Sequence, residues 1–208
     1  MIPVNFLAHQ GRALLLGLVT TGLLLVSSGC GGKLTTADSN VALGEVMGKK
    51  TAELLGGRGS VVILISEADG VKSPGLAKSI EAVKQALGDK IKVSAVENLQ
   101  LQPLPGLPLF SPQQFVEVLQ KHAAADALIS FVMLPKLPSA VAQQLPSPRP
   151  KVVSLVGVPF KNLFAQQVVY LAVLPKPEMA TVTAKTTQAL FDAKFQLVTP
   201  ETAGALPF

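Results

Sequence analysis

A run of five consecutive apolar residues, 61–65 (VVILI), most constrains what this chain can fold into. It lacks the apolar–polar alternation of a strand with one solvated face, and most of its side chains are β-branched. Such a run is typical of a strand buried on both faces of a parallel sheet. The polar residues 66–70 follow as a turn, so the chain is expected to leave the sheet there.

Helical patterns alternate with further strand patterns on either side of this run. Asp38 or Ser39 can cap a helix that runs to about residue 55, where two glycines end it. Ser73 precedes Pro74 and an apolar stripe that ends at Gly88, which predicts a second helix over 74–87. Residues 111–114 (SPQQ) form a capping box ahead of a third helix. Further strands are predicted at 91–96, 127–134, 152–158, 168–174 and 195–199, with short helices at 139–144 and 163–166 and an ambiguous, preferably helical segment at 179–190.

The connection over residues 98–110 is predicted to be an irregular loop. It contains Pro103, Pro105 and Pro108, which lack the backbone N–H that regular structure needs. Connections of this length are more often functional than short ones.

Strands alternating with helices predict an α/β fold, a three-layer sandwich around a mostly parallel sheet of about five to six strands with right-handed crossovers. The order of elements resembles one lobe of a type I periplasmic binding protein, or a flavodoxin-like (Rossmann-like) domain. The resemblance rests on the pattern alone, without a family motif. A complete two-lobed binding protein needs a second lobe, which this chain is expected to lack.

The N-terminal residues have the layout of a secretory signal. Arg12 precedes an apolar run over 13–26, and small residues then lead to Cys30, the only cysteine. The run has 14 residues, fewer than the roughly 20 that a membrane-spanning helix needs. Residues 26–30 (VSSGC) resemble the lipobox of bacterial lipoproteins, although Ser27 stands where leucine is commonest. The alternative is an ordinary signal peptide with an incidental cysteine.

That resemblance implies a diacylglycerol on the sulfur of Cys30, cleavage before it, and export. Gly31 is not the aspartate that resembles an inner-membrane retention signal, so the outer membrane is the expected location. We therefore expect a signal peptide over 1–29, a tether over 30–38 and a single α/β domain over 39–208. The expected partners are the membrane, through Cys30, and a small ligand or an envelope protein.

Composition excludes several functions. The formal net charge is +5 and no basic cluster is longer than two lysines, so nucleic-acid binding is not expected. No G-x-G-x-x-G follows a predicted strand, and residues 44–51 (GEVMGKKT) are one residue short of a phosphate loop and read as a helix face. Neither a cofactor nor a metal is expected, and His122 is assigned a capping or packing role rather than that of a catalytic base.

Ligands of open α/β sheets bind beyond the carboxyl ends of the strands. Three predicted strands are followed by proline with a lysine one or two residues later, and acids follow the first two strands. The candidate ligand or partner rim consists of Ser66, Glu67, Asp69, Glu97, Asn98, Lys136, Lys161 and Lys176. The competing interpretation is that these residues only make the turns soluble.

These features favour a lipid-anchored, non-catalytic envelope protein that binds a polar ligand or a protein at this rim. One alternative is an envelope hydrolase that uses Ser66 or Asp69. Another is a structural subunit of an envelope assembly that docks through residues 100–110.

Overall fold

The computed structural model describes residues 37–66, 73–100, 102–104, 107–155, 161–176 and 184–205. All of these belong to one compact unit, Leu34–Phe208, whereas Met1–Lys33 form a separate unit. The predicted signal peptide, Cys30 and most of the tether therefore lie outside the described residues. No helix of the described part combines the length and apolarity required to cross a bilayer.

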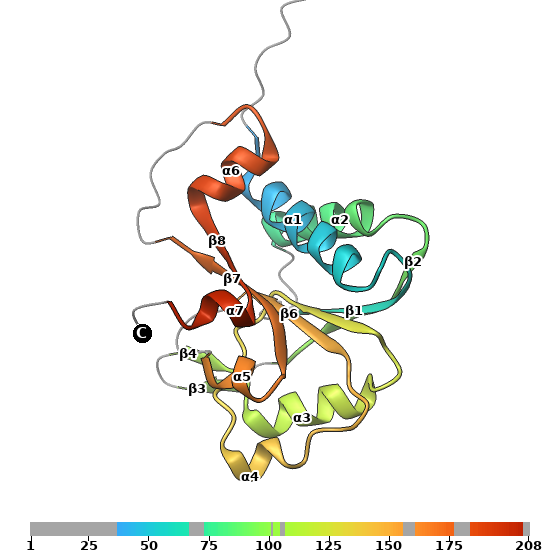
Figure 1. Ribbon diagram of the computed structural model, residues 1–208, viewed down its shortest axis with the longest axis vertical. Helices are drawn as coiled ribbons and strands as arrows, with labels where there is room; N and C mark the ends of the chain where they lie inside the picture. The colour runs from blue at the N-terminus through green and yellow to red at the C-terminus, as the bar shows by residue number, and fades with distance from the viewer. Residues whose placement is uncertain are drawn as a thin grey trace, which may run out of the picture. The chain divides into compact units, whose positions relative to one another are not determined.

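A six-stranded sheet organises the unit, in the order β2-β1-β5-β6-β7-β8. The strands are β1 (Gly59–Ile65), β2 (Ile91–Asn98), β5 (Ala127–Ser130), β6 (Lys151–Leu155), β7 (Val169–Pro175) and β8 (Phe195–Val198). Every neighbouring pair from β2 to β7 is parallel, and β8 alone runs antiparallel to β7. The predicted α/β class with a mostly parallel sheet is confirmed (Figure 1).

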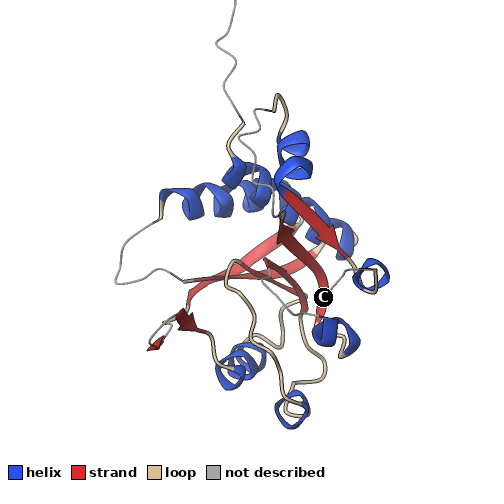
Figure 2. Cartoon of the chain, turned by 90° about the vertical axis from the view of Figure 1, so that its left-hand side faces the viewer, coloured by secondary structure: helices blue, strands red, loops and turns tan. Residues whose placement is uncertain are grey.

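Helices cover both faces of this sheet (Figure 2). One face packs against α1 (Ser39–Leu54), α2 (Pro74–Leu87) and α6 (Thr187–Lys194). The other packs against α3 (Pro112–Lys121), α5 (Lys161–Ala165) and α7 (Pro200–Ala203), with α4 (Ser139–Ala142) at its margin. The side chains of β1 contribute to the cores on both faces of the sheet. Val62 and Leu64 pack on the face covered by α3, which we call the α3 layer. Val61, Ile63 and Ile65 pack on the face covered by α1, which we call the α1 layer.

The structure corrects the sequence-based prediction of an irregular loop over 98–110. Its backbone forms an antiparallel hairpin of β3 (Gln102–Leu104) and β4 (Leu107–Leu109). Pro103 is paired with Pro108 at the middle position. Antiparallel pairs alternate between hydrogen-bonded and non-hydrogen-bonded positions. At a non-hydrogen-bonded position no backbone N–H is needed, so two prolines that face each other there remove no hydrogen bond between the strands. The prolines therefore do not exclude this hairpin.

Three predicted boundaries also change. The second strand extends from 96 to Asn98, so Glu97 and Asn98 are strand residues. The third strand ends at Ser130 rather than at 134, because the Ser130 hydroxyl bonds both backbone groups of Val132 and turns the chain out of the ladder. Pro200 not only closes the last strand but also begins α7. The described part of the ambiguous 179–190 segment is helical from Thr187.

Helices α1 and α2 cross at very short range through small residues. A Cβ atom on Gly44 would lie 2.1 Å from the backbone oxygen of Ser79, and one on Gly48 would lie 2.8 Å from Ala86 Cβ. The predicted helix face over 44–51 is thereby confirmed as part of α1.

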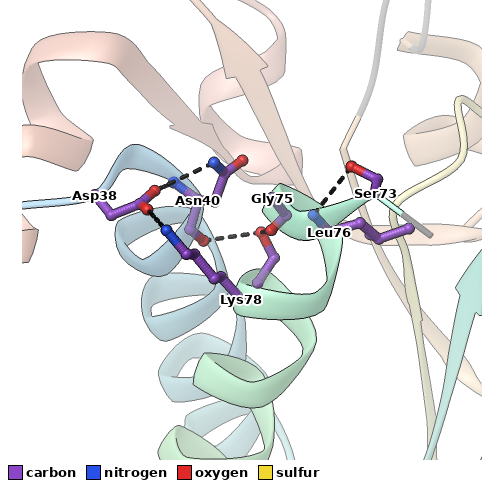
Figure 3. A network of polar contacts seen from close by, with 7 residues as sticks. Asp38, Asn40, Ser73, Gly75, Leu76 and Lys78 are labelled. Carbon is purple, nitrogen blue, oxygen red and sulfur yellow. Dashed lines mark hydrogen bonds and ion pairs between the residues drawn. The ribbon is translucent and has the colours of Figure 1, made fainter.

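Polar contacts close the N-terminal end of this helix pair (Figure 3). Asp38 caps α1 by accepting from the Asn40 N–H at 2.9 Å, and its other oxygen accepts from Lys78 of α2 at 2.7 Å. The Ser79 hydroxyl donates to the Asn40 carbonyl at 2.9 Å. The hydrogen bond from Lys78 and that from the Asn40 N–H together lower the pKa of Asp38. One carboxylate therefore both starts α1 and ties it to α2.

Candidate functional site

The carboxyl ends of β2, β1, β5, β6 and β7 share one edge of the sheet, because these five strands are parallel. The connection from β1 to β2 passes through α2 on one face, and that from β2 to β5 passes through α3 on the other. Strand order therefore reverses between β1 and β5. Such a reversal is where open α/β sheets form their ligand crevice.

The predicted rim residues are distributed unevenly about this edge. Ser66 directly follows β1 and is half-buried, while Asn98 ends β2 and is exposed. Lys136 is exposed on the segment after β5, and Lys161 begins α5. Asn98 and Lys161 each already have an interaction partner. Glu67 and Asp69 lie outside the described residues.

Lys176 is tied to a helix rather than left open at the rim. Its backbone N–H donates to the Lys194 carbonyl at 2.8 Å, and its Nζ donates to the Asp192 carbonyl. Both acceptors lie in the last turn of α6, where carbonyls lack helical partners and a positive charge is favourable. Lys176 therefore has a capping role that already engages its charge.

Glu97 is directed away from the rim by a β-bulge. Along β2 the pairing with β1 passes from Val61↔Val93 to Val62↔Ala95, so Ser94 is an extra residue. Before the bulge, Ile91 and Val93 pack with the α1 layer. An extra residue reverses which side chains point to which face. Beyond it, Ala95 and Leu99 pack with the α3 layer, and Glu97 lies on the same face.

Glu97 forms an ionic cluster with the end of α3. Its Oε1 accepts from Lys121 Nζ at 2.9 Å, and its Oε2 bonds His122 Nε2. A carboxylate only accepts, so Nε2 of His122 carries a hydrogen. The Glu97 side chain is 18% exposed and that of His122 is 14% exposed. Partial burial raises the pKa of Glu97, but the hydrogen bonds from His122 and Lys121 outweigh it and lower that pKa overall.

The cluster shows what sequence reasoning found and missed. The capping and packing role expected for His122 is confirmed, because the residue ends α3 and its ring is largely buried. Its pairing with Glu97 was not predicted. Predicting that pairing would have required locating the bulge at Ser94, and the alternation of residues in a strand does not reveal a bulge.

A pocket lies beside this cluster, between one stripe of α3 and the carboxyl end of β2. We call it the α3–β2 pocket; its volume is about 230 Å³ and it is open to solvent. Its apolar lining comes from Leu99, Phe110 and Val118. Its polar lining comes from Glu97 and Lys121 together with Gln100, Gln114 and Glu117.

Chemical machinery for a reaction is sparse in the described residues. They contain no cluster of three or more histidine, cysteine, aspartate or glutamate side chains able to hold a metal ion. The His122 ring is bonded to Glu97, and the hydrogen bonds of the described residues include none from a serine hydroxyl to this ring.

The fold is that of one lobe of a type I periplasmic binding protein, as comparison with solved structures shows. The solute-binding protein of an ABC transporter from Burkholderia graminis, in complex with D-arabinose, has a TM-score of 0.55 at 15% identity. AraP, an arabinose-binding protein from Geobacillus stearothermophilus, has a TM-score of 0.52 at 15% identity. The XylFII–LytSN complex has a TM-score of 0.52 at 14% identity.

These matches cover 80 to 82% of this chain but only 62% of each of the other chains. At such identities the likeness concerns the fold alone. The sequence itself matches no protein family and no curated protein.

Proposed function

We propose that this chain is a lipid-anchored, non-catalytic protein of the cell envelope that binds a small polar solute or a protein partner at the carboxyl edge of its sheet. The observation that carries the proposal is the reversal of strand order between β1 and β5, with Ser66 and Asn98 at the ends of β1 and β2. Exposed Met133, after β5, adds an apolar surface to the same edge.

The comparisons support a binding role over catalysis. The similar structures include proteins named for binding arabinose, and others named as periplasmic solute-binding proteins. The alternative is a hydrolase that uses Ser66 or Asp69, but the similar solved structures are named as binding proteins. This chain spans about three-fifths of the length of those proteins. That it binds a solute as they do is therefore our proposal.

The second candidate for the bound molecule is a protein partner. The β3–β4 hairpin gives ordered backbone to the segment that was predicted to dock an envelope assembly. The XylFII–LytSN complex shows that a chain of this fold can be found with a second molecule.

Solute binding is tested by thermal unfolding of the purified chain with a panel of pentoses, hexoses and amino acids. A ligand at 100 times its Kd stabilises the native state by about 2.7 kcal/mol. Asn98→Ala should remove that shift, and the matched control Asn162→Ala, on α5, should retain it. A shift that survives both Asn98→Ala and Ser66→Ala would refute the carboxyl edge as the site.

The anchor is tested by replacing its sulfur. Cys30→Ser should abolish acyl labelling and leave an uncleaved precursor, whereas Ser28→Ala keeps a small residue near the cysteine and should be processed normally. A single acyl chain holds a protein only marginally and two or more hold it stably. Acyl labelling that persists in Cys30→Ser would show that the lipid is attached elsewhere.

A further inference from the structure

We propose that the corner of the domain where β1 and β2 begin binds the surface of an anionic phospholipid membrane. We call this surface the basic corner; it consists of Arg58, Lys84, Lys90 and Lys92. It lies at the amino edge of the sheet, at the opposite end of the parallel strands from the carboxyl edge of the proposed function. The inference therefore concerns a second surface and goes beyond solute binding.

The fold brings together cations that are far apart in the chain. Arg58 directly precedes β1 and Lys90 directly precedes β2. The first residues of the two strands, Gly59 and Ile91, pair with each other, so the two cations stand at neighbouring positions. Lys92 follows two positions after Lys90, on β2 itself. Figure 1 shows both connections, from α1 into β1 and from α2 into β2, on the right-hand side of the domain.

The charges of the basic corner are exposed and unengaged. None of its four side chains makes an ion pair or a hydrogen bond to another described residue. Lys84 lies in the last turn of α2, where the helix carbonyls favour a positive charge. Other cations near the amino edge are engaged, since Lys50 pairs with Glu53 and Lys151 Nζ donates to the Leu54 carbonyl. The basic corner is thus a local excess of free positive charge.

This excess is unfavourable for the domain alone. Like charges at neighbouring positions of adjacent strands destabilise a sheet. Exposed Asp89, beside Lys90, offsets part of the repulsion, but four cations outnumber this one carboxylate. A surface that carries many negative charges would relieve the repulsion, and its attraction to the corner needs no shaped pocket.

The composition of the corner favours lipid headgroups over nucleic acid. Neither residues 56–60 nor residues 84–92 include an aromatic side chain. Proteins that bind single-stranded nucleic acid stack its bases on aromatic rings. An anionic lipid surface requires only positive charge, and each lysine or arginine near it tightens binding by about fivefold.

The basic corner can contact the membrane that holds the proposed anchor, and only this step rests on that anchor. The eight peptide units between Cys30 and Asp38 can span at most about 28 Å. The 16 residues of α1, which separate Asp38 from the corner, have a length of about 24 Å. One acyl chain holds a protein only marginally, whereas one chain together with a basic patch holds it stably. The corner would supply this second contact.

The test measures how the full-length chain partitions onto lipid vesicles, with Cys30→Ser as a common background that removes the acyl chain. Vesicles of phosphatidylcholine are compared with vesicles of equal parts phosphatidylcholine and phosphatidylglycerol. The partition coefficient should be about 100-fold larger for the anionic vesicles. Lys90→Gln/Lys92→Gln should lower this ratio by about 30-fold. The matched control Lys136→Gln/Lys185→Gln removes the same charge from exposed positions elsewhere, and should change the ratio by less than about twofold because distant charges are screened.

Any of four results would overturn the inference. The first is equal partition onto both kinds of vesicle. The second is an equal loss in both double variants, which would show that net charge and not the basic corner attracts the lipid. The third is a preference that persists in about 1 M salt, where the Debye length is about 3 Å. The fourth is tighter binding of a DNA oligonucleotide than of the anionic vesicles, which would assign the corner to nucleic acid.

These outcomes are distinguishable from failure of the proposed function. Solute binding at the carboxyl edge is tested by Asn98→Ala and does not depend on the charges of the basic corner. Circular dichroism of each variant checks that it is folded.

Discussion

Gly44→Ala should destabilise the domain although alanine is the better helix former. The new Cβ would lie 2.1 Å from the Ser79 carbonyl oxygen and 2.9 Å from two further backbone atoms of that residue. Backbone cannot rotate away as a flexible side chain can, so α1 and α2 must separate. Overpacking costs up to about 3 kcal/mol, and replacing a helical glycine by alanine returns about 1 kcal/mol. We expect a net loss of about 2 kcal/mol.

The assay is urea and thermal unfolding followed by circular dichroism. For a domain of this size, about 2 kcal/mol corresponds to a Tm lower by about 4–8 °C. Gly204→Ala is the matched control, because Gly204 has right-handed φ and nothing within 4 Å of its would-be Cβ; its stability should change by less than about 0.5 kcal/mol. If Gly44→Ala is as stable as the wild type, the close α1–α2 crossing is wrong.

Three further predictions concern the cap of α1, the ionic cluster of Glu97 and the bulge in β2. Asp38→Ala should cost about 1 kcal/mol through the lost cap, measured by urea unfolding against the exposed control Asp89→Ala. Glu97→Gln should lower the free energy of unfolding near neutral pH by about 1 kcal/mol. Because the folded-state pKa of Glu97 is lowered, its contribution to stability is complete above the unfolded-state pKa and is lost as the pH falls through the folded-state pKa. The stabilities of wild type and variant should therefore converge in acid, and a constant difference down to pH 3 would contradict the pairing. Deleting Ser94 should be tolerated, because Val93 and Ala95 then follow each other as in a regular strand and keep their faces and their partners in β1; a loss of stability larger than that of Glu97→Gln, measured by urea unfolding, would argue against the bulge.

Helix starts were predictable from sequence because their signals are local. Asp38, Ser73 and Ser111 each precede an apolar stripe, and each accepts a hydrogen bond from a backbone N–H of the helix that follows. The buried strand over 61–65 was predictable for the same reason, since its pattern is contained in the run itself.

Strand ends and side-chain partners were not predictable, because they depend on residues far apart in the chain. Glu97 and His122 are 25 positions apart and meet only because a single extra residue in β2 turns the carboxylate toward α3. The engagement of Lys176 with α6 depends on the antiparallel return of β8, which no local pattern indicates. The rim was therefore predicted as a set of equivalent strand ends, although its described members have different roles.

The bulge in β2 also bears on how this protein avoids self-association. β2 lies at the end of the strand order, so in the described sheet it has a hydrogen-bonded neighbour on one side only. A straight, regular border strand would offer its free backbone groups to another molecule and so seed intermolecular sheets. The extra residue at Ser94 breaks the spacing of those groups and increases the local twist. At high protein concentration, chains would thereby be protected from aggregating through this edge strand.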